Sequence, residues 1–186
     1  MPSVTAYALI SILFTIDYFL GFQSLIMPNW LVYVSRFPLK LEIHYGLFKK
    51  CSSVQGCYPF PSPERNDCDE EWFCELWNAA RFAVLFAAFV GAVTWLALVV
   101  VMLGGRGKRE RMWGSIAAWL MFHAFFQFTA VGLIAYLFNN SDRFYFGYKY
   151  DMSFIFATIS GSLSVMLSIS LVLNGVLVPS RYDYLD

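Results

Sequence analysis

Four long apolar stretches constrain this chain more than any other feature of its sequence. Each is long enough to cross the hydrocarbon core of a bilayer, which takes about 20 mostly apolar residues in a helix. Backbone groups in lipid must pair within their own segment, so each stretch is predicted to be helical. The predicted spans run from Thr5 to Met27, Ala79 to Leu103, Trp113 to Phe138 and Met152 to Val178.

The composition agrees with burial in lipid rather than in a watery interior. Hydrophobic residues make up 59% of the chain and charged residues 14%, against about 45–50% and 25% in soluble domains. The formal net charge is zero, so no global basic field attracts nucleic acid. No repeat or linker divides the 186 residues. We therefore expect a single mainly α-helical membrane domain over 1–186 with no nucleic-acid partner.

The first span carries no Lys or Arg before it and no small-x-small site after it. A cleaved signal peptide typically has both a basic start and such a cleavage site. Because this span has neither, we expect it to be kept as a helix. The four spans then leave loops 28–78, 104–112 and 139–151 and a tail, 179–186, outside the bilayer.

The orientation follows from the short loop 104–112, which carries Arg106, Lys108, Arg109 and Arg111. Short basic loops stay in the cytosol, and such cations also suit anionic lipid head groups. The opposite side holds more Lys and Arg in total, but spreads them over the long loop 28–78 beside an excess of acids. Because the rule weighs short loops, we predict a multi-pass plasma-membrane protein with both termini in the cytosol.

All four cysteines lie in the long loop 28–78, where an oxidising compartment would pair them. Four cysteines allow three pairings, and spacing favours Cys51 with Cys57 and Cys68 with Cys74. Zinc is the competing use, but its ligands usually stand two to four residues apart, and the Cys-x5-Cys spacing here is longer. We therefore expect two disulfides and no metal. A glycosylation acceptor sequence at Asn139 lies on the same predicted side.

The long loop also contains strand signals. Apolar residues alternate with polar ones from Leu39 to Tyr45, a pattern typical of a half-buried strand. Residues 29–37 read as extended as well, and the prolines at 59, 61 and 63 end regular structure. The acidic stretch 67–75 would suit calcium, but a solvated loop is the favoured interpretation.

Residues of this loop resemble a family motif: Trp30, then Gly46-Leu47-Phe48, then Cys51 and Cys57, with Arg81 at the head of the second span. The pattern is similar to the W…GLW…C…C motif of the claudin superfamily. That superfamily includes peripheral myelin protein 22, the epithelial and lens fibre membrane proteins and the calcium-channel gamma subunits. Phe48 stands where the family prefers Trp, and the second cysteine pair is additional.

The resemblance implies a left-handed bundle of four transmembrane helices capped by a small antiparallel β-sheet in the first extracellular loop. In that fold the paired cysteines Cys51 and Cys57 brace two strands. Trp30 and Leu47-Phe48 form the apolar underside of the sheet at the bilayer surface. Arg81 is expected to pair with a loop carboxylate or a carbonyl, or to extend to the interface.

Three polar side chains inside the predicted spans, Asp17, His123 and Gln127, bear on how the helices pack. A carboxylate near mid-bilayer costs about 2.5–3.5 kcal/mol, so Asp17 is expected to face the bundle. Counting along the helices places Asp17 at the depth of Gln127, with His123 one turn closer to the cytosol, and we expect Asp17 to pack against one or both. An interhelical hydrogen bond that specifies the bundle is the favoured interpretation; a proton or cation relay is the alternative.

No enzyme motif is present: the sequence has no nucleophile elbow, HExxH, phosphate-binding glycine loop or CxxC pair. We expect a protein without catalytic residues or cofactor. Its partners would be membrane lipids and other membrane proteins, contacted in adhesion, barrier formation or membrane organisation. The alternatives are an accessory subunit of a channel, receptor or transporter, and a small transporter or relay using Asp17.

Overall fold

The computed structural model describes residues 4–35, 41–144 and 147–177. Four long helices make up most of it: α1 (Val4–Ile26), α2 (Phe73–Leu103), α3 (Arg106–Asn140) and α4 (Met152–Leu177). Each is long and apolar enough to cross a membrane, which confirms the prediction of a mainly helical, four-span membrane protein. The predicted tail 179–186 and part of the predicted extended segment 29–37 lie outside the described residues.

Two helices extend beyond the spans expected from hydropathy. The structure begins α2 at Phe73 rather than Ala79, and α3 at Arg106 rather than Trp113. At about 1.5 Å per residue both exceed the hydrocarbon core of about 30 Å, so polar turns at their ends continue the helix outside the apolar layer. The predicted loop 104–112 is thereby reduced to Gly104 and Gly105. Gly105 has φ +78°, a conformation that glycine adopts without steric cost.

The helices pack in a ring. Both α1 and α3 pack against α2 and α4, so α1 and α3 lie diagonally across the bundle. Small residues on α4 make this close packing possible, because serine and glycine let neighbouring helices approach. The buried face of α4 contains Ser153, Ala157, Ser160, Gly161, Ser164 and Ser168.

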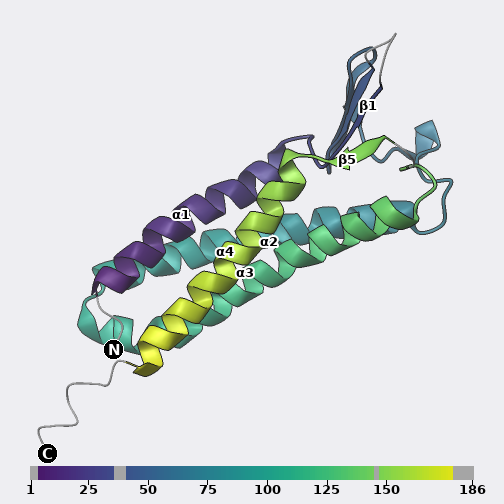
Figure 1. Cartoon of the computed structure of the whole chain (residues 1–186). Coiled ribbons are helices and arrows are strands. Elements are labelled where there is room, and N and C mark those ends of the chain that lie inside the picture. Colours follow the sequence, from purple (N-terminus) through teal and green to yellow (C-terminus); the bar gives the residue numbers. More distant parts are fainter. Residues whose placement is uncertain (1–3, 36–40, 145–146, 178–186) are drawn as a thin grey trace, which may run out of the picture.

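A five-stranded antiparallel sheet stands at one end of the bundle, opposite the end where Val4 and Leu177 lie (Figure 1). Its strands are β1 (Leu31–Val34), β2 (Glu42–Tyr45), β3 (Lys49–Ser52), β4 (Gly56–Pro59) and β5 (Tyr148–Tyr150), in the order β4-β3-β2-β1-β5. This confirms the predicted small antiparallel sheet. The sequence did not predict β5, which arrives from the segment between α3 and α4 and pairs with β1.

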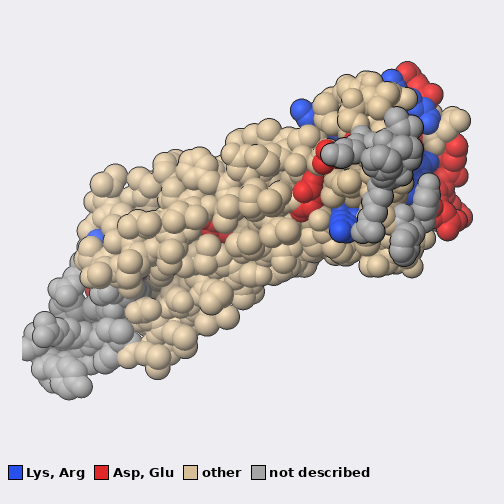
Figure 2. Space-filling model, turned by 45° about the horizontal axis from the view of Figure 1, so that its top comes forward, with Lys and Arg blue, Asp and Glu red and all other residues tan. Residues whose placement is uncertain are grey.

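We call the sheet and its surrounding segments, residues 28–72 and 141–151, the head. A short 3-10 helix, Pro63–Arg65, lies in the segment that returns from β4 to α2. Lys, Arg, Asp and Glu gather over the head, whereas the length of the bundle on the face drawn in Figure 2 is almost free of charge. This separation is the expected surface of a protein whose bundle lies in lipid and whose head lies in water.

The turn between β2 and β3 packs directly on the chain leaving α1. The Gly46 N–H donates to the Lys49 carbonyl at 2.9 Å, which closes the turn. A Cβ atom at Gly46 would lie 2.4 Å from the Pro28 Cα, closer than any side chain allows. Because the obstructing atom belongs to the backbone, the turn cannot accept alanine without moving the sheet.

We expect Gly46→Ala to destabilise the protein by about 1–3 kcal/mol, the range for overpacking in a filled site. The measurement is thermal unfolding of the purified chain in mild detergent. Gly132→Ala is the matched control, because a Cβ there meets no atom within 4 Å. An unchanged unfolding midpoint for Gly46→Ala would contradict the contact with Pro28.

Candidate functional site

Both predicted disulfides are formed. Cys51 bonds to Cys57 and Cys68 bonds to Cys74. The first joins paired positions on β3 and β4 and so fixes the outer hairpin of the sheet. The second ties the loop before α2 to the first turn of that helix. Each of the four cysteines therefore belongs to a disulfide, and none has a free thiol to serve as a zinc ligand in this structure.

The junction between the head and the bundle is organised around one backbone carbonyl, that of Leu47. Arg81 donates to it from Nε at 3.0 Å and from Nη2 at 2.7 Å, and the Trp77 indole N–H donates from 3.3 Å. Nη2 of Arg81 also donates to the Phe60 carbonyl at 2.6 Å. The guanidinium carbon lies 4.9 Å from the centre of the Phe48 ring.

Arg81 therefore pairs with carbonyls, one of the options that the sequence left open. Its planar guanidinium carries several donors in a fixed arrangement, so one side chain of α2 holds both the β2–β3 turn and the end of β4. A helical arginine thus fixes the sheet to the bundle through backbone atoms.

The family-motif residues fall into two groups in the structure. Trp30 and Leu47 are buried beneath the sheet, as expected, and the Trp30 indole N–H donates to the Ser24 carbonyl at 2.8 Å. Phe48 differs, because 41% of it is exposed and it covers the guanidinium of Arg81 from outside. The prediction that Leu47 and Phe48 form the underside together is therefore correct for Leu47 alone.

An aromatic core fills the space between the sheet and the ends of α2 and α3. Ring centres lie 5.0–6.2 Å apart between Tyr45, Phe60, Phe73, Trp77 and Phe144, in several edge-on pairs. Such pairs contribute about 0.5–1.5 kcal/mol each beyond the burial of their area. Burial in this core raises the pKa of the Tyr45 hydroxyl.

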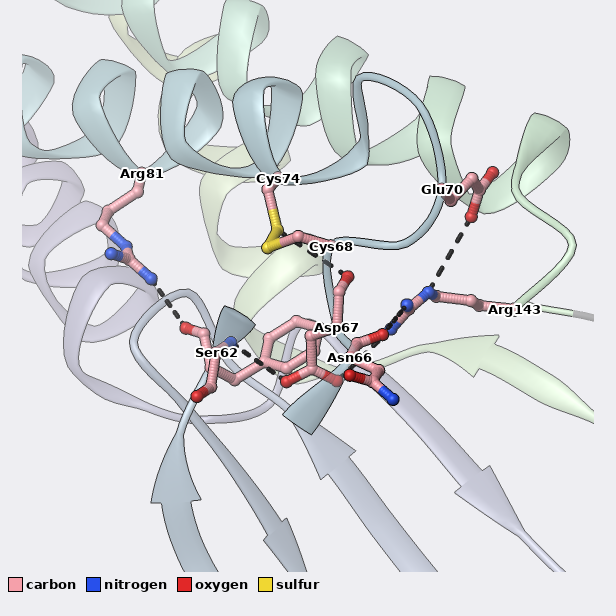
Figure 3. The surroundings of a disulfide bond; sticks show 9 residues. Ser62, Asn66, Asp67, Cys68, Glu70, Cys74, Arg81 and Arg143 are labelled. Carbon is pink, nitrogen blue, oxygen red and sulfur yellow. Dashed lines mark hydrogen bonds and ion pairs between the residues drawn. A yellow bond between two sulfur atoms is a disulfide. The ribbon is translucent and has the colours of Figure 1, made fainter. Parts of the chain in front are cut away.

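A second fastening joins the two segments of the head, as Figure 3 shows. Arg143 donates to the Asp67 carboxylate at 3.3 Å and to the Asn66 carbonyl at 2.7 Å. The other carboxylate oxygen of Asp67 accepts the Ser62 N–H at 3.0 Å. The acidic stretch 67–75 is therefore partly engaged in structure, next to the Cys68–Cys74 disulfide, rather than a freely solvated loop.

Sequence reasoning missed Arg143, although a signal was present. The acid-rich segment 67–75 and Arg143 lie in two loops on the same predicted side of the membrane, so their opposite charges could have indicated a pair.

Asn139, the predicted glycosylation site, lies in the last turn of α3, where its side-chain amide donates to the Ala135 carbonyl at 2.8 Å. The hydroxyl of Ser141, the third residue of the acceptor sequence, donates to Glu70 at 2.5 Å. Glycosylation of Asn139 stays a prediction.

The polar residues inside the bundle form one buried layer. Asp17 is fully buried, and the Ser164 hydroxyl on α4 donates a hydrogen bond to its carboxylate. The Ser160 hydroxyl, one turn away on α4, lies beside the same carboxyl group and 3.4 Å from His123 Nε2. His123 Nδ1 lies 2.9 Å from the Ala87 carbonyl of α2. The layer thus connects all four helices.

The hydrogen bond to Asp17 comes from Ser164 on α4, a partner that the sequence did not predict. Packing of Asp17 against Gln127 or His123 stays a prediction. Depth counting gives the height of a residue in the bilayer but not the side of the helix, and α1 neighbours α4 directly. The side chain of Gln127 does contact α1, at Gly21, which lies one helical turn from Asp17. A Cβ atom added at Gly21 would lie 2.6 Å from the Gln127 Nε2 atom.

These contacts define the chain as a four-span membrane protein with a disulfide-bonded head, which Arg81 fastens to the bundle and Arg143 holds together. Comparison with models of known protein families found no match, and comparison with curated proteins found none either.

We expect Arg81→Met to lower the free energy of unfolding by about 1–3 kcal/mol for each carbonyl left without a donor. Two carbonyls are at stake, although Trp77 still serves that of Leu47. Arg65→Met is the matched control, because Arg65 lies over the Tyr58 ring on the surface. Thermal unfolding in detergent compares the two variants. Equal losses would show that Arg81 does not fix the head.

We expect Asp17→Ala and Ser164→Ala each to destabilise the bundle by about 0.6–1.7 kcal/mol, the range for hydrogen bonds between membrane helices. The double variant should lose little more than either single variant, because both remove the same hydrogen bond. Ser162→Ala is the control, since that exposed hydroxyl bonds within its own helix to Thr158. Additive losses would contradict the pairing.

The alternative role of Asp17, a proton or cation relay, has a separate test. Loss of an ion flux in the Asp17→Asn variant, at unchanged surface abundance, would favour the relay.

Proposed function

We propose that this chain is a non-enzymatic, claudin-like tetraspan protein of the plasma membrane, which acts through protein–protein contacts of its head. The head would face the outside of the cell and both termini the cytosol, because four cations cluster at the start of α3 and the disulfides need an oxidising compartment. The converging motif residues Trp30, Gly46, Leu47 and Arg81 support the likeness to the claudin superfamily.

One observation carries the proposal. Trp72, at the outer end of the Cys68–Cys74 loop, is 64% exposed and has φ +65°. The left-handed conformation costs an L-residue roughly 1–2 kcal/mol, and a tryptophan exposed to water gains no burial to offset that cost. Local strain of this kind concentrates at functional sites, and tryptophan is enriched among residues that dominate binding energy.

Neighbouring contacts fix the position of Trp72 on the surface. Its indole N–H donates to the Glu71 carboxylate at 3.0 Å, and the Cys68–Cys74 disulfide closes the loop that contains it. Arg143 fastens the same loop to the second segment of the head. A surface that is ordered before binding loses little conformational entropy on association, so a single exposed aromatic can contribute strongly.

Neither histidine supports an enzymatic site. Both ring nitrogens of His44 face carboxylates, Glu42 at 3.2 Å and Asp151 at 3.0 Å. Both nitrogens of His123 are engaged by Ala87 and Ser160. A general base needs a nitrogen within reach of the substrate proton, and these contacts occupy every one. The histidines act as cross-links in this proposal.

A second candidate function, that of an accessory subunit, is favoured by a ridge of phenylalanines on α2 and α3. Phe86 stacks with Phe82 at 6.0 Å and contacts Phe126 at 4.7 Å, and Phe89 is 63% exposed. Aromatic side chains supply large contact areas. This ridge lies on the outer surface of the helical bundle rather than on the head. It would dock against the transmembrane helices of a larger protein.

Trp72 and Phe89 are equally exposed, which makes them a matched pair for the experiment. The full chain is expressed in mammalian cells, cross-linked at the surface, purified in mild detergent and examined by mass spectrometry. We expect Trp72→Ala to lose the captured partner, or self-association between facing cells, because the head makes the contact. Phe89→Ala should leave it unchanged.

The opposite result, loss with Phe89→Ala alone, would replace the proposal with the accessory-subunit function. Thermal unfolding separates these outcomes from misfolding. Trp72→Ala removes an exposed side chain and should leave the unfolding midpoint near that of the unmodified chain. Retention of all partners by both variants would contradict both functions.

A further inference from the structure

A groove is lined by the end of α2 and the start of α3. These helix ends lie at the end of the bundle opposite the head (Figure 1). The groove has a volume of about 730 Å³, within the range of about 300–1,000 Å³ that is usual for ligand sites. Its walls differ along their length. Leu96, Val100 and neighbouring residues of α2 form an apolar side, whereas Lys108 and Arg111 of α3 stand at the other end.

Glycines open this groove. Gly107 lines it, and a Cβ there would meet no atom within 4 Å, so the position is open. The stem of Lys108 lies across Gly104, where a Cβ would come within 2.2 Å of its Cδ. Residues three and four positions apart share one face of a helix, which places Gly107, Lys108 and Arg111 together on the side facing α2.

The groove opens toward the bilayer. Leu96 and Val100 lie on the last turns of α2 and are 56% and 55% exposed, so their surroundings in the membrane are acyl chains. Lys108 and Arg111 follow directly after the two-residue link between the helices, at the level of the lipid head groups. Among the described side chains neither cation forms a salt bridge.

We propose that this groove binds one anionic glycerophospholipid of the adjacent leaflet. An acyl chain lies along Leu96 and Val100, and the head group lies between Lys108 and Arg111. The two cations are complementary to a phosphodiester that carries a further carboxylate, as in phosphatidylserine. The occupant is a lipid, because the apolar half of the groove faces the interior of the bilayer.

Arg109 provides a matched control within the same segment. It carries the same charge as its neighbours but does not line the groove. Its backbone carbonyl accepts the Tyr7 hydroxyl of α1 at 2.9 Å, so this position lies on the inner side of α3. General attraction between the basic segment and an anionic membrane would treat Arg109 and Arg111 alike, whereas a defined site distinguishes them.

The test is native mass spectrometry of the full chain in mild detergent with equimolar palmitoyl-oleoyl phosphatidylserine and phosphatidylcholine. We expect the unmodified chain to retain phosphatidylserine in preference. Lys108→Gln and Arg111→Gln should each weaken that binding about fivefold, and Arg109→Gln should leave it unchanged. Gly107→Leu, which fills the groove without changing charge, should abolish retention of the lipid.

Equal weakening by Arg109→Gln and Arg111→Gln would overturn the site in favour of general electrostatic attraction. Equal retention of the two lipids by the unmodified chain would overturn the preference for an anion. Binding that survives Gly107→Leu would show that the groove is not the location. Gly107 lies in the first turn of α3, where a Cβ meets no atom within 4 Å, so this variant is expected to fold, and its unfolding midpoint is measured alongside.

Discussion

The structure depends on the contact between the Arg81 guanidinium and two backbone carbonyls, those of Leu47 and Phe60. The strands of the sheet are only three or four residues long, at the short end of the usual range, so the sheet relies on packing against the helix ends. It is stable here because α2 continues past the apolar layer and presents an arginine and the Trp77 indole to the β2–β3 turn. The tight approach of Gly46 to Pro28 follows from the same contact, since the turn must lie close to the helix ends to be reached.

The lack of water in the bilayer core explains the remaining polar contacts of the bundle. Any polar side chain there needs a protein partner, and the small residues of α4 bring that partner close to α1. Asp17 consequently lies against two serines, and His123 reaches across to α2. The same requirement does not act on the head, where charges are free to pair or to face solvent. Its acids therefore divide between Asp67, held by Arg143, and more exposed neighbours such as Glu71.

Features encoded in consecutive residues were predictable, and features made by distant residues were not. Hydropathy alone located four helices, and the Cys-x5-Cys spacing identified the hairpin that Cys51 and Cys57 close. The strand Tyr148–Tyr150 was not predicted, because three residues are too few to show an alternation of apolar and polar side chains. Its pairing with β1 also depends on where α3 ends and α4 begins. The partner of Asp17 escaped for a related reason. A sequence gives depth along each helix, but the ring order of the helices decides which side chains meet.

The position of the buried polar layer bears on its role. Toward the head it is covered by an apolar cluster that includes Val84, Ile134 and Ala157, and toward the other end by one that includes Phe14, Leu98 and Leu120. Buried polar side chains also occur on both sides of Asp17 along α4. The hydroxyl of Ser153 donates to the Met27 carbonyl and that of Ser168 to the Ala117 carbonyl, so each is engaged in helix contacts. We interpret the layer as a structural element that specifies how the helices pack. This interpretation fits the two proposals that place function at the ends of the molecule, at Trp72 and at the basic groove.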